Sequence, residues 1–187
     1  MPTLSPRLMR ALDTAAHAHR NHRRKASGIP YISHLFAVMY LLGQVTDDED
    51  ILVAALLHDT IEDVPEEYSE SRMRREFGDR VTDIVLDVTK DGTLSNWQAR
   101  SDAYLHHLSH GAREEAVLLS CADKLHNLKS TLADHEEIGE ALWDRFNAGK
   151  ERQQWWYGAI FQVVRARLPH NLLIGEFERL VKELQRL

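Results

Sequence analysis

Apolar residues recur three and four positions apart along most of the chain, the spacing that produces one buried face on an α-helix. Near the amino terminus, Leu8, Leu12 and Ala15 follow this spacing. Ser5 precedes them, and a serine at this position commonly caps a helix. A first helix is therefore expected to begin after Ser5 and to fade near Lys25.

The rest of the chain repeats this pattern in segments separated by Gly, Pro and short polar stretches. Alternation with a period of two is nowhere sustained, so an all-α fold is predicted. Asp47 and Ser69 are expected to cap the helices that follow them, and residues 89–96, around Gly92, to form a loop. The further predicted helices are 32–42, 51–58, 70–77, 79–88, 97–108, 112–131, 138–146, 150–168 and 172–187.

The length of 187 residues fits one domain, so residues 1–187 are expected to form a single bundle of roughly eight to ten helices. Hydrophobic residues make up 43% of the chain, enough for a packed core. No apolar run reaches the ~20 residues of a membrane span, and residues 1–10 lack the apolar core of a secretory signal. The lone Cys121 suits a reducing compartment. A cytoplasmic protein without a membrane partner is expected.

The charge balance limits the class of partner. Twenty-three basic residues against 29 acidic ones give a net charge of −6, which argues against general nucleic-acid binding. The basic residues do cluster locally, at positions 20–25, where a small phosphorylated ligand could bind. Eleven histidines direct attention to metal and proton chemistry.

The sharpest chemical feature is the sequence HDTIED at positions 58–63, directly after the apolar segment 51–57. If the helix continues through it, His58 lies one turn from Glu62, and Asp59 one turn from Asp63. Burying such groups without partners costs several kcal/mol each. A solvated helix end is the simpler alternative, but the apolar run before His58 favours burial.

Two further segments supply similar donors. His34 stands near the start of the predicted helix 32–42, and Asp123 shares one helical face with Asn127. Together with His58 and Asp59, these residues would make a mixed nitrogen and oxygen site with room for water. Imidazole with carboxylate suits Mn²⁺, Fe²⁺ or Zn²⁺, and the absence of thiolates disfavours a structural zinc site. Open positions are typical of a hydrolase.

Several segments together resemble the HD-superfamily hydrolases of the RelA/SpoT type, most closely the stand-alone small alarmone hydrolases such as the metazoan SpoT homologue. The resemblance covers about residues 10–165, which would form the motif-bearing core before a C-terminal helix at about 172–187. The matching segments are HRNHRRK at 19–25, GIPYISH at 28–34, AALLHDTIED at 54–63, FG at 77–78, VTK at 88–90 and ADKLHNL at 122–128.

The resemblance implies an HD-type helical bundle with a metal site in its central cleft. It implies hydrolysis of the 3′-pyrophosphate of guanosine tetra- and pentaphosphate, (p)ppGpp, with one Mn²⁺ ion, although other divalent ions would be possible. The ligands implied by matching position are His34, His58, Asp59 and Asp123.

The resemblance also implies roles around the substrate. Glu62 and Asp63 match an acidic pair that positions or deprotonates the attacking water. The residues matched to substrate contacts are Arg24 at the purine, Lys25 beside it, Asn127 at the ribose and Ser130 one turn further on. A stacking arginine does not distinguish guanine from adenine, so (p)ppApp is an equal candidate.

Some positions depart from the family pattern or carry other signals. Leu35 replaces a common proline, and Arg100 is the only cation near a position where relatives have an Arg-Lys pair. The aromatic run 155–157 is expected to be core, with a place near the nucleotide as the alternative. His17, His19 and His22 are not expected to share a metal ion, because His17 and His19 project from different faces of a helix. The oligomeric state is left open.

Two other functions remain to be weighed. The chain could be a different HD phosphohydrolase that acts on nucleotide monophosphates or NADPH, or a non-catalytic nucleotide sensor. The segments 23–25 and 30–34 favour alarmone hydrolysis over the first. The presence of Glu62 and Asp63 beside all four ligand candidates argues against the second, since a pure binder has no need of them.

Overall fold

Helices make up nearly all the regular structure of the computed structural model, which describes residues 4–24, 27–146 and 148–187. Over these residues no β-strand forms, and one antiparallel bridge joins Arg23 to Pro30. The all-α prediction is confirmed. The elements are α1 (Pro6–Ala18), α2 (Ile32–Leu42), α3 (Glu49–Leu57), α4 (Thr60–Asp63), α5 (Glu70–Phe77), α6 (Asp79–Val88), α7 (Trp97–His110), α8 (Glu114–Ile138), the 3₁₀ helix η1 (Gly139–Arg145), α9 (Gly149–Arg167) and α10 (Leu173–Leu184).

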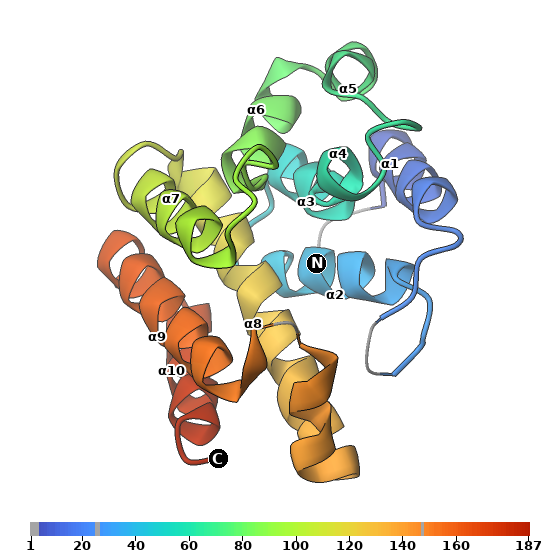
Figure 1. Cartoon of the computed structure of the whole chain (residues 1–187). Helices are drawn as coiled ribbons and strands as arrows, with labels where there is room; N and C mark the ends of the chain where they lie inside the picture. Colours follow the sequence, from blue (N-terminus) through green and yellow to red (C-terminus); the bar gives the residue numbers. More distant parts are fainter. Residues whose placement is uncertain (1–3, 25–26, 147) are drawn as a thin grey trace.

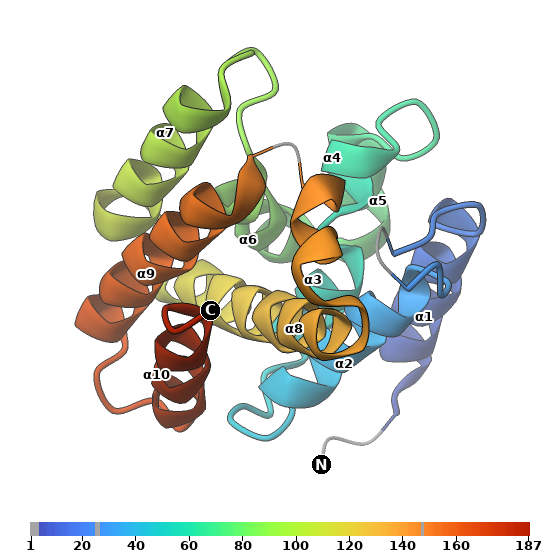
Figure 2. The same cartoon turned by 60° about the horizontal axis from the view of Figure 1, so that its bottom comes forward.

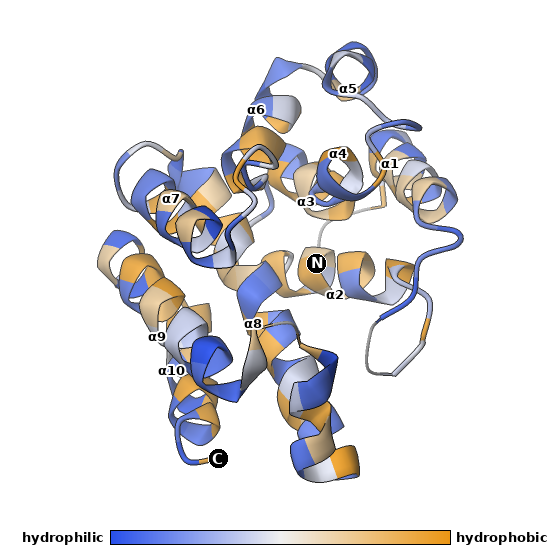
Figure 3. Cartoon of the chain, viewed as in Figure 1, coloured by the Kyte–Doolittle hydropathy of each residue, from blue (hydrophilic) through white to orange (hydrophobic). Residues whose placement is uncertain are grey.

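The short helix α3 lies at the centre of one half of the molecule. All its residues from Ile51 to Leu57 are buried, as their apolar sequence predicts. Helices α1, α2, α6 and α8 pack against it. Figure 3 shows hydrophobic residues gathered on α2 and α3, while α5 at the periphery is largely hydrophilic. Whatever follows α3 in the sequence therefore begins inside the core.

The long helix α8 connects the two halves of the fold. It runs through the middle of the molecule, with α2, α3 and α6 packed on one part and α9 and α10 on another (Figures 1 and 2). The C-terminal helix α10 packs on α8 and α9, where the rings of Phe177 and Phe161 meet edge to face with centroids 5.6 Å apart. No described helix combines the length and the apolar character needed to cross a membrane.

Two predicted helix ends are wrong. The first helix ends at Ala18 rather than near Lys25, because the chain turns at residues 19–22 and the His22 carbonyl accepts a hydrogen bond from the Tyr31 amide. Helix α8 continues past residue 131 to Ile138, since no glycine or proline interrupts it before Gly139. Gly139 has a φ of 62°, a conformation that favours glycine, and the segment after it is 3₁₀ rather than α-helical.

The helix does not continue through HDTIED. Helix α3 ends at Leu57 and α4 begins at Thr60, so His58 and Asp59 lie in a turn between them. The His58 Nδ1 contacts the Ala55 carbonyl at 2.8 Å, and the Thr60 hydroxyl donates to the Leu57 carbonyl. These side chains take carbonyls that a continuing helix would use. The cap of α3 is Asp48, one residue after the predicted Asp47.

Truncation in α3 should weaken the whole fold. Leu56 is fully buried, so Leu56→Ala is expected to lower the free energy of unfolding by about 2–5 kcal/mol. Phe36→Ala, at a side chain 48% exposed on α2, is the control and should change it by less than ~1 kcal/mol. Urea unfolding in the presence of a chelator measures both. Equal effects of the two changes would contradict the central position of α3.

Candidate active site

Four side chains from three parts of the fold meet beside α8: His34 in the first turn of α2, His58 and Asp59 in the turn after α3, and Asp123 in α8. His34 Nε2 lies 3.2 Å from Asp123 Oδ1 and 3.7 Å from Asp59 Oδ2. His58 Nε2 lies 3.1 Å from Asp59 Oδ2 and 3.7 Å from Asp123 Oδ1. The structure thus brings together the four residues matched to metal ligands; we call them the quartet.

The chemistry of the quartet fits a divalent cation. Both imidazoles are buried, and neither Nε2 atom has a hydrogen-bond partner within the described chain. The opposite ring nitrogens are occupied: His58 Nδ1 lies 2.8 Å from the Ala55 carbonyl, and His34 Nδ1 lies 2.8 Å from Nδ1 of His126. This outer contact holds each ring with Nε2 directed at the carboxylates, an arrangement typical of metal-ligating histidine.

The charges within the quartet are strongly coupled. Burial opposes ionisation of Asp123, but Lys124 and the two imidazoles hold the pKa of its carboxyl well below the usual value. Burial likewise opposes charge on His58, yet the neighbouring Asp59 carboxylate raises the pKa of His58 well above its usual value. Positive charge is therefore favoured between the two acids, which is the environment that a metal ion requires.

Three residues without a predicted metal role support the quartet. The Tyr31 hydroxyl donates to Asp59 Oδ2 at 2.6 Å, and Lys124 Nζ lies 2.5 Å from Asp123 Oδ2. Nδ1 of His126 contacts Nδ1 of His34 at 2.8 Å. Tyr31 and Lys124 belong to the recognised motifs, but nothing in their spacing indicated that they point at the carboxylates.

A pocket of about 480 Å³ opens next to the quartet. Three of the predicted substrate-contacting residues, Arg24, Asn127 and Ser130, line it. Asn127 ties the pocket to the quartet, because its amide nitrogen donates to Asp123 Oδ1 at 2.6 Å and its oxygen accepts from Arg24 at 2.9 Å. The fourth, Lys25, lies outside the described residues.

The aromatic run 155–157 is core at two of its three positions, as expected. Trp156 and Tyr157 are buried in the core, and Tyr157 also lines the pocket. Trp155 is 39% exposed and meets the ring of Trp97 edge to face.

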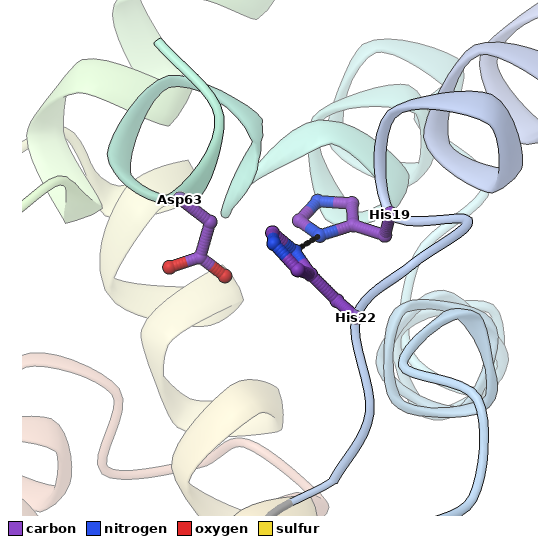
Figure 4. Close-up of side chains that lie close together, drawn as sticks. All are labelled: His19, His22 and Asp63. Carbon is purple, nitrogen blue, oxygen red and sulfur yellow. Dashed lines mark hydrogen bonds between the residues drawn. The ribbon is translucent and has the colours of Figure 1, made fainter.

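The two acidic residues Glu62 and Asp63 are exposed and have different surroundings. Glu62 Oε2 accepts a hydrogen bond from the Lys90 amide at 3.2 Å, which fixes the carboxylate against the end of α6. Asp63 lines the pocket and faces two histidines, His19 and His22 (Figure 4). The adjacent acids thus do not form one symmetrical pair.

Lys90 supplies a cation that the sequence analysis did not single out. Its Nζ lies 5.1 Å from the ring centroid of Trp156 and 5.9 Å from that of Tyr104. Burial, with the charge of Lys124 adding to it, lowers the pKa of Lys90 to about 8. A bound phosphate would favour its charged form. Lys90 and Lys124 therefore place positive charge near the quartet.

Comparison with known proteins defines the class. The HD domain family matches residues 11–145, more than half of the chain. A solved structure of a metazoan ortholog of SpoT that hydrolyzes ppGpp superposes with a TM-score of 0.84 over 100% of both chains at 26% identity. The guanosine-3′,5′-bis(diphosphate) 3′-pyrophosphohydrolase MESH1 of Danio rerio is 39% identical over 175 residues, which cover 90% of this chain and 88% of that protein.

Longer relatives match only in part. The chain is 40% identical over 123 residues to a GTP pyrophosphokinase of Streptomyces coelicolor but spans only 14% of its length. The fold and the His/Asp quartet thus define an HD-domain protein. Within that family, the chain belongs with the RelA/SpoT-type proteins, next to those named MESH1.

The half-buried His126 behind the quartet should make stability depend on pH. Burial lowers the pKa of His126 from 6.5 to about 4, so the unfolded chain binds more protons than the folded one between these values. Stability present above pH 6.5 should therefore be lost as the pH falls to 4. His126→Gln should remove part of that loss, less than the ~3 kcal/mol of the full pKa difference because solvent screens the half-buried ring. Unfolding of chelator-treated protein at several pH values measures it.

The control for this experiment is His106→Gln, which removes an exposed histidine on α7. Its unfolding free energy should follow the wild-type pH dependence. If His126→Gln also follows the wild-type curve, burial of a neutral imidazole behind His34 is contradicted.

Proposed function

We propose that this chain hydrolyses the 3′-pyrophosphate of hyperphosphorylated guanosine nucleotides, (p)ppGpp, releasing pyrophosphate and GDP or GTP. The observation that carries the proposal is the convergence of His34, His58, Asp59 and Asp123 beside a pocket of nucleotide size, with both Nε2 atoms lacking a hydrogen-bond partner among the described residues. The near full-length similarity to proteins named for this activity supports it.

The quartet would hold the metal ion, for which we propose a single Mn²⁺. Two imidazole nitrogens and two carboxylate oxygens suit Mn²⁺, Fe²⁺ or Zn²⁺ and leave positions open for water. When bound, such an ion lowers the pKa of its water and offsets charge on phosphoryl oxygens. The residues behind the quartet fix the ring orientations, so the ligands need little rearrangement on binding.

Glu62 is proposed as the group that accepts the proton of the attacking water. Its carboxylate is exposed and is held by the Lys90 amide, which leaves its second oxygen Oε1 to face the water. Asp63, which lines the pocket, is proposed to help position that water. Lys90 and Lys124 would offset the charge of the 3′-phosphates.

The nucleotide is proposed to occupy the 480 Å³ pocket. The Arg24 guanidinium is held by Asn127 and lies 5.8 Å from the Tyr31 ring centroid, so its flat face can stack on a purine. Asn127 would contact the ribose, Ser130 would add a hydroxyl, and Lys25 would meet phosphate. Because stacking does not select the base, (p)ppApp is proposed as a second substrate.

Two other HD functions give different results in the same assay. A phosphatase of nucleotide monophosphates or NADPH would release inorganic phosphate from those compounds, and a sensor would bind the alarmone without turnover. The pocket favours the alarmone, because Arg24, Asn127 and Ser130 all line it beside the quartet. A cytoplasmic setting, which the buried lone Cys121 suits, is part of the proposal.

Removal of one ligand should abolish metal-dependent turnover. Asp59→Ala removes one of the four proposed ligands and one negative charge, so the site should bind Mn²⁺ more weakly. Pyrophosphate release from ppGpp with Mn²⁺ should therefore fall to the level of wild-type protein in chelator. Asp13→Asn, an exposed change on α1, should retain wild-type activity. Product analysis by chromatography measures both. Wild-type protein that binds ppGpp but never releases pyrophosphate would support the sensor instead.

Loss of the proposed base should act on the chemical step. Glu62→Gln is expected to lower kcat by about 100-fold or more, since general bases contribute on this scale, while KM changes by less than ~3-fold. Glu66→Gln, at an exposed acid in the following turn, is the matched control and should leave both constants unchanged. A parallel rise in KM with unchanged kcat would instead assign Glu62 to substrate binding.

A further inference from the structure

A second group of metal-ligating side chains lies where the chain turns after α1. One ring nitrogen of His19, one of His22 and one carboxylate oxygen of Asp63 all lie within 4.8 Å of one another. Figure 4 shows the two rings and the carboxylate facing one space, with the rings on the turn and Asp63 on α4. Two imidazoles and one carboxylate are the donor set of known zinc and iron centres.

The two imidazoles are spaced as ligands of one ion would be. Their Nδ1 atoms are 3.1 Å apart, and two nitrogens bound to one tetrahedral ion at ~2.0 Å lie ~3.3 Å apart. A hydrogen bond between the rings gives the same distance. Nε2 of His19, a side chain only 2% exposed, has no hydrogen-bond partner in the described chain, and an ion bound through this second ring nitrogen instead would satisfy it. Such an unused buried group costs about 1–3 kcal/mol.

The backbone and Tyr31 hold both rings in place. The His22 amide donates to the His19 carbonyl at 2.9 Å, and the His22 carbonyl accepts from the Tyr31 amide at 3.0 Å. The Tyr31 ring stacks on His19 with centroids 5.0 Å apart and planes 26° apart. Little conformational entropy would therefore be lost when the rings bind an ion.

We propose that His19, His22 and Asp63 form a second divalent-metal site, distinct from the quartet, which binds Zn²⁺ or a neighbouring first-row transition ion. Tyr31 lies between the two sites, since it contacts His19 and donates to Asp59 of the quartet. His22 and Asp63 also line the 480 Å³ pocket, which gives an ion its path inward.

The chemistry of the three groups agrees with this assignment. Three protein ligands leave a position for water or for a phosphate oxygen in the pocket. Asp63 lines the pocket, so an ion bound to its carboxylate would lie at the pocket wall. Binding of an ion at this second site does not require that the chain hydrolyses a nucleotide.

The test counts ions. Full-length protein is stripped with a chelator, dialysed against Zn²⁺ buffered to a low micromolar free concentration, and analysed for zinc per chain. The wild type is expected to bind about two ions, and His22→Gln and Asp59→Ala about one each. The double variant should bind almost none. His17→Gln, an exposed change in the last turn of α1, and His106→Gln, in the exposed pair with His110, should each retain two.

The outcomes separate the two sites. The second site is overturned if His22→Gln binds as much zinc as the wild type. It is also overturned if His22→Gln loses no more zinc than His17→Gln or His106→Gln. Loss of one ion by His22→Gln but none by Asp59→Ala upholds the second site and contradicts the quartet, and with it the proposed function. Thermal melting checks that each variant folds; if His22→Gln does not, Asp63→Asn reports on the same site with the same expected loss.

Discussion

The structure depends on one electrostatic requirement: two imidazoles and two carboxylates are held together where an apolar core ends. Helix α3 is buried along its length, and the turn after it delivers His58 and Asp59 directly to the face of α8 that carries Asp123. Two carboxylates in such a place are costly unless positive charge neutralises them. Lys124 and His58, whose pKa is raised, provide part of that positive charge, and a divalent ion would provide the rest.

The neighbouring pocket shares side chains with this centre. Asn127 bonds to Asp123 on one side and to Arg24 on the other, so the proposed purine-stacking arginine and a proposed metal ligand are joined through one amide. Tyr31 makes a similar link, because it donates to Asp59 and stacks on His19. A substrate that moved Arg24 or Tyr31 would therefore also move the proposed metal ligands. A substitution at either residue should affect both the pocket and the quartet.

The sequence predicts the helices well where apolar periodicity is strong and flanked by stop signals. Gly78 ends α5 as predicted, whereas the end of α1 depends on a pairing of His22 with Tyr31, nine residues further along the chain, which leaves no periodic signal. The break after Leu57 depends on the side chains of His58 and Thr60, which take carbonyls from the helix. The helix propensity of the local sequence carries no information about such contacts.

In the candidate site, too, some residues could be predicted from the sequence and others could not. The quartet could be anticipated because its members stand in distinctive motifs, and the structure places their side chains together. The cluster of His19, His22 and Asp63 could not, because it forms only when the turn after α1 meets α4, some forty residues later. The same holds for Lys124, whose direction is set by the tertiary packing around α8.

The central claim is that the quartet holds a divalent ion. The most direct test is an anomalous difference map, at the manganese edge, from crystals of the full chain grown with Mn²⁺. The account predicts a strong peak about 2.0–2.3 Å from Nε2 of His34, Nε2 of His58 and a carboxylate oxygen each of Asp59 and Asp123. A well-ordered map with no peak among these four side chains, or with either ring turned away from the acids, would contradict it.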